Sequence, residues 1–389
     1  MSEHTFLSLP WFQEILPFLT FDPALLSTDT AMAQQSASFA PRLIHHGFVR
    51  LTPRKVWGEA VPEASLRLLS EGLAVLHALG LPLGLLSCCS EAQALARQLG
   101  QLLRGALPPG EGHACIGDWA FFHVGRGGKG WPPHRDRARV QGALLAPNGT
   151  PAYITCWMPL SSATPEASCL YFLPRNKDPG FEVGDGGEDS PDDEAGGSGG
   201  GGSGNPLTRA FSTPESFQNI IGLPTARGGL VCFSSRTLHW GGAPLQLEGE
   251  WEEEEGGPRP PRQALSIAFA VPSFEAPALQ RSGACEAPTF AEAVVLACAQ
   301  ALIYHVQQPL AAEHARAMLG IVRASGRALL ESTYFERARK AGEWAAFTTG
   351  FSSALGSKGG AAPSGGEVAL AFAAMAGKEM GFDVSAYQP

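Results

Sequence analysis

The chain has 389 residues, of which 44% are hydrophobic, and a formal net charge of −9. This length accommodates one large core with helical additions or two domains, and the acidic balance without a basic stripe argues against a nucleic-acid partner. No apolar run reaches the roughly 18 residues that a membrane span needs, and no signal peptide or C-terminal Ser-Lys-Leu address is present, so we expect a cytoplasmic protein without a membrane partner.

The N-terminal region, residues 1–110, is predicted to be mainly helical and to pack on the core. Segments 60–79 and 90–103 are rich in Leu and Ala, with Glu and Arg between them. Apolar residues spaced three and four apart lie on one face of a helix, which predicts a buried stripe. This stripe comprises Leu66, Leu69, Leu73 and Leu76.

Residues 111–275 have a different texture, in which short β-prone runs are separated by Gly and Pro. This pattern predicts an antiparallel sandwich or barrel. Two polar segments interrupt it: 184–205 is acidic and then rich in Gly and Ser, which predicts a disordered loop, and 241–261 is a second acidic insertion. The candidate strands are 118–124, 153–159, 169–174, 229–233 and 263–271.

Residues 276–389 return to a helical texture and are predicted to form a C-terminal helical region and tail. Helices are expected at 290–307 and 311–340, followed by a linker rich in Gly, Ser and Ala at 350–366 and a short helix at 367–380. The eight cysteines include no Cys-x-x-Cys pair. Their apolar surroundings predict buried core residues in a reducing compartment, and they argue against a cysteine hydrolase.

The most informative motif is the His-x-Asp pair of His134 and Asp136, which follows Trp131-Pro132-Pro133. Side chains alternate along a strand, so residues two apart point to the same side and can share one metal ion. A third ligand must come from a distant strand, and His239 follows such an apolar run. Two histidines and one carboxylate leave three positions open, as in non-haem iron(II) oxygenases, although the same ligands bind other divalent metals.

An oxygenase that uses 2-oxoglutarate also needs a cation for the distal carboxylate. Arg262 opens the first candidate strand after His239, and its planar fork suits a carboxylate. Ser266 is four residues further on and shares a strand face with Arg262. Arg259 competes for this role, but it lies among prolines.

The order of these motifs resembles the phytanoyl-CoA dioxygenase family. The resemblance rests on His134-x-Asp136, a strand with Trp157, a following Cys169-Leu170 strand, His239, and Arg262-x-Ala264-Leu265-Ser266, and it covers residues 113–275. It implies a double-stranded β-helix, also called a jelly roll, flanked by N- and C-terminal helices, in a mainly β protein with helical additions. The residue two after the distal histidine is often a hydroxyl residue in this family and is Gly241 here.

The resemblance also implies the roles of these residues. His134, Asp136 and His239 would ligate Fe(II), Arg262 would bind the distal carboxylate of 2-oxoglutarate, Trp157 would flank this cosubstrate, and Ser266 would add a hydrogen bond. The implied reaction consumes dioxygen, hydroxylates a small-molecule or acyl substrate, and releases succinate and carbon dioxide. The carboxylate of Asp136 argues against halogenation.

Several alternatives remain open from the sequence. A non-enzymatic jelly-roll protein that binds a metal or ligand is the main alternative function, and a nucleic-acid demethylase is disfavoured by the charge. Arg135 and Arg137 either bind an acidic substrate group or are solvated, and Arg236 is either a second anion contact or a surface residue. His123 either faces the pocket or is a core histidine.

Overall fold

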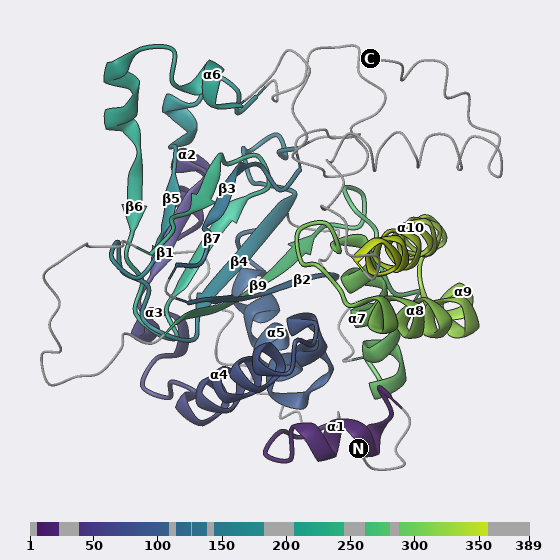
Figure 1. Ribbon diagram of the computed structural model, residues 1–389. Coiled ribbons are helices and arrows are strands. Elements are labelled where there is room, and N and C mark those ends of the chain that lie inside the picture. Colours follow the sequence, from purple (N-terminus) through teal and green to yellow (C-terminus); the bar gives the residue numbers. More distant parts are fainter. Residues whose placement is uncertain are drawn as a thin grey trace, which may run out of the picture.

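The structure is a computed structural model that describes most of the chain (Figure 1). The predicted disordered loop at 184–205, most of the acidic insertion at 241–261, and the predicted linker and last helix after Gly356 lie outside the described residues. The described ranges are 6–22, 39–108, 114–125, 127–137, 144–182, 206–244, 261–280 and 288–356.

The described residues form two antiparallel sheets and a set of helices, a mixed architecture of both element types. The five-stranded sheet has the order β1 (Phe48–Leu51), β7 (Leu230–Ser234), β4 (Tyr153–Pro159), β9 (Arg262–Ala270), β2 (Ala114–Val124). The four-stranded sheet has the order β3 (Trp131–His134), β8 (His239–Gly241), β5 (Leu170–Phe172), β6 (Ile221–Leu223).

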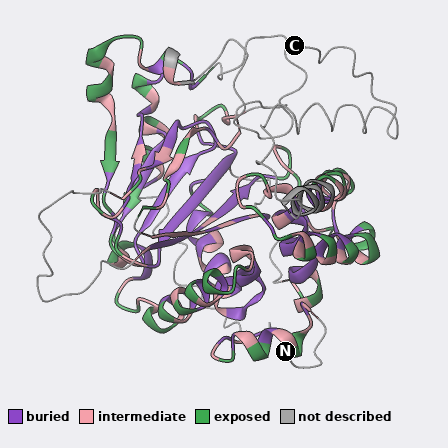
Figure 2. Ribbon diagram, in the orientation of Figure 1, coloured by how far each residue is buried: buried purple, intermediate pink, exposed green. Residues whose placement is uncertain are grey.

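The five-stranded sheet is buried on both faces, as the purple strands of Figure 2 show. Along β4, Cys156 and Met158 belong to the large apolar cluster that the helices share, whereas Trp157 belongs to a second cluster. The second cluster also contains Phe172 of the other sheet, so the two sheets pack against each other. We call the face of the large sheet that bears Trp157 the inner face. Burial on both faces explains the nearly continuous apolar sequence of β4.

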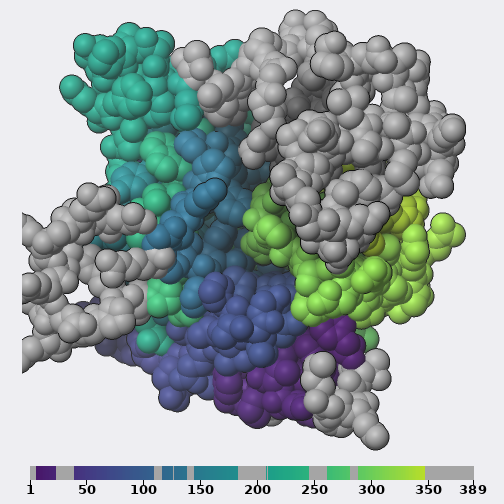
Figure 3. All heavy atoms as spheres, in the orientation of Figure 1, coloured from purple at the N-terminus to yellow at the C-terminus, as the bar shows by residue number. Residues whose placement is uncertain are grey.

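The helices cover the outer face of the large sheet. The predicted stripe on α4 (Glu63–Ala78) is confirmed, because its four leucines are fully buried in the shared cluster with α5 (Ser90–Leu103). Among the C-terminal helices, α7 (Phe290–Ile303) contacts β2 of this sheet. A capping box of Thr289 and Glu292 begins this helix. Figure 3 shows the atoms of the N-terminal helices, in blue, beside those of the C-terminal helices, in green.

The remaining helical elements are short, apart from α8 and α10, which pack on each other and on α7. They are α1 (Leu9–Ile15), α2 (Ala40–His46), α3 (Pro53–Trp57), η3 (Leu83–Cys88), η4 (Arg175–Lys177), α6 (Pro206–Ala210), η5 (Pro214–Asn219), α8 (Ala312–Ile321), η6 (Val322–Gly326), α9 (Arg327–Leu329) and α10 (Ser332–Gly356). In the described ranges no helix combines the length and the apolar content that crossing a membrane requires.

Three expectations about the elements need correction. Residues 48–51 of the predicted helical region form β1, because they pair with β7 at the edge of the large sheet. The predicted helix 311–340 is divided before α10, since Leu330 adopts an extended conformation, pairs with Leu279 and is fully buried. Helix α10 runs to Gly356, so the predicted linker cannot begin at Gly350. Six cysteines among the described residues are free thiols, and all six are buried, as expected.

Candidate metal centre

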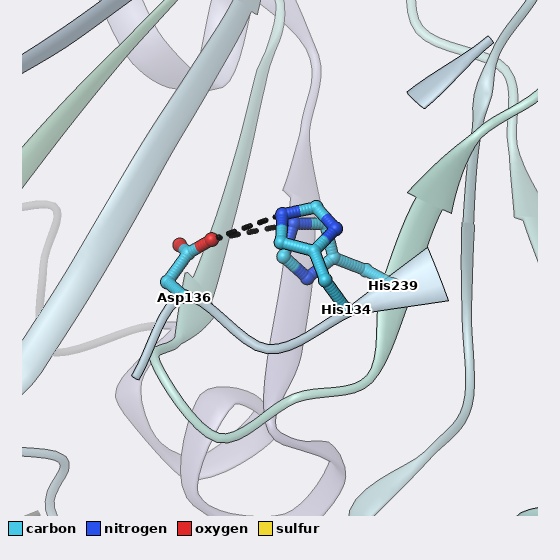
Figure 4. Close-up of side chains that lie close together, drawn as sticks. All are labelled: His134, Asp136 and His239. Carbon is cyan, nitrogen blue, oxygen red and sulfur yellow. Dashed lines mark ion pairs between the residues drawn. The ribbon is translucent and has the colours of Figure 1, made fainter. Parts of the chain in front are cut away.

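The four-stranded sheet brings two predicted ligands together at the end of β3, and the loop that follows supplies the third. His134 is the last residue of β3 and lies directly opposite His239, the first residue of β8, in the antiparallel pairing. Asp136 follows in the loop after β3 and points back toward both imidazoles (Figure 4). The pairing therefore joins two residues that are far apart in the sequence.

The distances suit a single metal ion. The Oδ1 atom of Asp136 lies 3.4 Å from Nε2 of His134 and 3.6 Å from Nε2 of His239, and one ligand atom of each residue lies within 4.8 Å of the others. Ligand atoms at 2.0–2.2 Å from an ion and at right angles to each other are about 3 Å apart. Small movements of the three side chains would bring their ligand atoms within bonding distance of one ion. The nitrogen and carboxylate donors suit iron(II).

Backbone carbonyls orient both imidazoles. The Nδ1 atom of His134 lies 2.8 Å from the carbonyl oxygen of Pro132, and Nδ1 of His239 lies 3.0 Å from that of Thr237. A carbonyl only accepts hydrogen bonds, so each Nδ1 carries a proton and each Nε2 faces Asp136, where it would be the ligand atom for a metal ion. Such a contact behind a metal ligand fixes both its tautomer and its orientation.

The electrostatics favour the protonation states that a metal ion requires. Burial opposes ionisation of Asp136, but His239, His134 and the Thr155 hydroxyl together hold the pKa of this carboxyl well below its usual value. Burial, and after it His134, lowers the pKa of His239 to about 4. Near pH 7 the group therefore contains a carboxylate and a neutral buried imidazole. The side chain of His134 is 33% exposed and that of His239 only 6%, so the group is reached from the His134 side.

Thr155 is a contact of the site that the sequence did not single out. Its hydroxyl on β4 donates a hydrogen bond to Oδ2 of Asp136. Thr155 lies two residues before Trp157, so strand alternation puts both on the inner face. This period-two relationship was the signal from which Thr155 could have been predicted.

Arg262 forms a buried cationic site beside β8. It is 3% exposed, its Nη1 donates to the carbonyl oxygen of Ser168 at 3.2 Å, and its Nε has no hydrogen-bond partner among the residues that the structure describes. No carboxylate in the described ranges pairs with it, and burial lowers the pKa of its guanidinium to about 10, so it stays charged at pH 7. A buried cation with an unsatisfied donor suits a carboxylate ligand.

Trp157 and Ser266 lie on the same face as Arg262. Ser266 is opposite Trp157 in the pairing of β4 with β9, and the guanidinium carbon of Arg262 is 6.0 Å from the Trp157 ring centre. The same carbon is 5.8 Å from the ring centre of Phe122 on β2. These aromatic rings exclude water from the cation. The roles of Trp157 and Ser266 toward a cosubstrate remain predictions.

The structure also places the residues whose roles the sequence left open. Arg135 is fully buried against Asp178, and Arg236 is 4% exposed, so the solvated and surface interpretations are wrong for these two. Arg137 pairs with Asp118 and Glu275. His123 stacks on His77 at 4.0 Å and contacts Gln263 on the outer face, away from the three ligands. The competitor Arg259 lies outside the described residues.

Comparisons with known proteins give one family and several solved structures. The phytanoyl-CoA dioxygenase family model matches residues 73–244, which include the three ligands but not Arg262. The epimerase SnoN from nogalamycin biosynthesis is 16% identical, covers 61% of this chain and 83% of its own, and has a TM-score of 0.37. AviO1 from Streptomyces viridochromogenes Tue57 is 17% identical, covers 64% of this chain and 98% of its own, and has a TM-score of 0.40. EctD from S. alaskensis, solved with 2-oxoglutarate and 5-hydroxyectoine, is 12% identical, covers 66% of this chain and 83% of its own, and has a TM-score of 0.36. No curated protein matches.

Proposed function

We propose that the chain is an Fe(II)- and 2-oxoglutarate-dependent dioxygenase that hydroxylates a small-molecule or acyl substrate, since the phytanoyl-CoA dioxygenase family model matches residues 73–244. One observation carries the proposal: an unpaired buried cation lies beside the strand that begins with a candidate metal ligand. A Cβ atom built on Gly241 would lie 3.1 Å from Nη1 of Arg262, and Gly241 is two residues after His239. Two residues along a strand span about 7 Å, which suits the two ends of a five-carbon oxo diacid.

The proposed metal ligands are His134, Asp136 and His239. Bound iron(II) and 2-oxoglutarate supply the oxidising chemistry, in which dioxygen is consumed, succinate and carbon dioxide leave, and a C–H bond of the substrate is hydroxylated. The protein would hold the metal through two imidazoles and a carboxylate, each of which has a further hydrogen bond. A metal with only these three protein ligands would keep coordination positions for the cosubstrate and dioxygen.

Arg262 binds the distal carboxylate of 2-oxoglutarate in this proposal. Its Nε and Nη groups would bind the carboxylate as a fork, and this would also give a partner to Nε, which has none among the described residues. Trp157 and Phe122 form the apolar walls that keep water from this ion pair. Ser266, on the same strand face, adds a hydroxyl donor.

We also propose that the two packed sheets form a double-stranded β-helix. Its support is the strand order, β2-β9-β4-β7 in one sheet and β3-β8-β5-β6 in the other. From β2 to β9 the chain therefore crosses to the other sheet after every strand except β5. The division into regions 1–110, 111–275 and 276–389 belongs to the same proposal, with helices at both ends of a β core. The cytoplasmic location and the absence of nucleic-acid and membrane partners stay predictions from the sequence.

The test uses the full chain under anaerobic conditions with Fe(II) and 2-oxoglutarate. The expected result is the weak visible charge-transfer band of an iron-bound 2-oxo acid. His134→Ala should abolish it, whereas His123→Ala, which changes a histidine on the outer face, should keep it. Absence of the band in folded, iron-loaded wild-type protein would favour the non-enzymatic binding protein instead.

A further inference from the structure

A fully buried ion pair lies directly behind the candidate metal centre. Nη1 of Arg135 donates to Oδ2 of Asp178 at 2.5 Å and Nη2 donates to Oδ1 at 2.9 Å, so the guanidinium holds both carboxylate oxygens. The side chains of both residues are 0% exposed. A bidentate pair without solvent is geometrically specific, because neither partner can move without leaving a charge unpaired.

Arg135 is the residue between the two ligands of the His-x-Asp pair. Arg135 directs its side chain to Asp178, whereas the side chains of His134 and Asp136 contact each other. Its backbone, however, is shared by both ligands. Anchoring the Arg135 side chain therefore limits the movement of His134 and Asp136 together.

Further hydrogen bonds connect this anchor to the segment that leads to His239. Nη1 of Arg135 also donates to the carbonyl oxygen of Arg236 at 2.5 Å. The Nε atom of Arg236 donates to the carbonyl oxygen of Phe181 at 3.1 Å, and the amide of Gly180 donates to Oδ1 of Asp178 at 2.9 Å. Three segments, 134–137, 178–181 and 235–239, are thus joined around one guanidinium–carboxylate pair.

Strand pairing alone is a weak restraint for these ligands. Strand β3 has only four residues and its pairing with β8 is irregular between Trp131 and His134. Asp136 lies beyond the end of β3, so no ladder hydrogen bond fixes it. The remaining restraints on its backbone come from neighbouring residues, including the amide of Arg137, which donates to the carbonyl oxygen of Ser235 at 3.2 Å.

We propose that Arg135 and Asp178 are positioning residues of the metal centre, which set the spacing between the His134–Asp136 segment and His239 from behind. This inference rests on the proposed function, because it presupposes that the three residues bind a metal ion. Residues that support metal ligands from outside the coordination sphere typically change metal affinity by about 10- to 100-fold when they are replaced. The same change is expected here.

The test measures binding of Co(II) alone to the full chain, by visible absorption and by calorimetry. The double variant Arg135→Gln with Asp178→Asn removes both charges and keeps hydrogen-bonding side chains, so no buried charge is left unpaired. We expect Co(II) affinity about 10- to 100-fold below wild type and an altered absorption spectrum. The control is Leu302→Ala on α7, which removes buried apolar contacts outside the three segments and should keep wild-type affinity and spectrum.

A second variant guards against failure to fold. Arg135→Lys keeps the positive charge opposite Asp178 but cannot hold both of its oxygens. Weaker Co(II) binding by folded Arg135→Lys supports the positioning role. Wild-type affinity and spectrum in either folded variant would overturn it and leave the pair a structural role only. If wild-type protein itself bound no Co(II), the proposed metal centre would be rejected first, and the inference with it.

Discussion

Replacing Arg262 should affect the ligand-free and ligand-bound protein in opposite ways. Arg262→Met keeps an unbranched side chain of similar reach beside Trp157 and Phe122 but removes the charge and the fork. In the proposed complex the wild-type guanidinium makes charge-assisted hydrogen bonds to a buried carboxylate. Removing one partner of such a pair costs about 3–5 kcal/mol, so the Kd for 2-oxoglutarate should rise by roughly two to four orders of magnitude.

The ligand-free protein should respond differently because it carries an unpaired buried charge. Burial lowers the pKa of Arg262 from 12.5 to about 10, so the folded state disfavours the charged form that is present at pH 7. A shift of this size corresponds to roughly 3 kcal/mol. Loss of the hydrogen bond to Ser168 offsets about 1 kcal/mol of the relief. Arg262→Met should therefore leave the ligand-free protein as stable as wild type, or more stable by up to roughly 2 kcal/mol.

The assay combines calorimetric titration of 2-oxoglutarate into Mn(II)-loaded protein with thermal unfolding in its presence and absence. Wild-type protein should be stabilised by the ligand, and Arg262→Met should not. Arg262→Lys is the matched control, because it keeps the charge without the fork and should bind with intermediate affinity. The reasoning fails if Arg262→Met loses several kcal/mol of ligand-free stability while it binds 2-oxoglutarate as wild type does.

Three further predictions concern single contacts of the site. Thr155→Val removes the hydroxyl on Asp136 at nearly constant shape and should weaken Mn(II) binding by about tenfold, whereas Thr155→Ser should restore it in the same titration. Gly241→Ala places a methyl group 3.1 Å from Nη1 of Arg262 and should raise the Kd for 2-oxoglutarate by about tenfold at unchanged Mn(II) affinity; equal loss of both would contradict this. Wild-type protein with free metal at 100 times its Kd should lose about 2.7 kcal/mol of unfolding free energy when a chelator removes the metal. In the same calorimetric measurement, the chelator should not change the stability of His134→Ala.

Local patterns predicted two of the longer elements of the fold closely. The predicted strand 153–159 coincides with β4, and the predicted helix 90–103 coincides with α5. In both segments the apolar pattern and the length indicate the type of element from the local sequence alone. The short strands β1, β6 and β8 were not predicted, because three or four residues carry little pattern and their pairing partners lie far along the chain.

The proximity of the predicted ligands followed from motif order, but their supports did not. The structure brings His134, Asp136 and His239 together, as the spacing of one His-x-Asp pair and one distant histidine suggested. The partners of Arg135 could not be predicted, because Asp178 lies in an irregular segment that only the tertiary fold brings to it. A charged residue next to a motif usually indicates a solvated position, and here burial reversed this expectation.

The cross-strand pairing of His134 with His239 also has a consequence for folding. Strand β3 is an edge strand that contains Pro132 and Pro133, which cannot donate ladder hydrogen bonds, so it is weakly held by its backbone. The two histidines are separated by a long stretch of chain, and closing such a loop is slow and entropically costly. An ion bound between them would act as a removable cross-link that closes this loop. Metal loss should therefore loosen the edge at β3 first, and amide hydrogen exchange should be fastest there in metal-free protein.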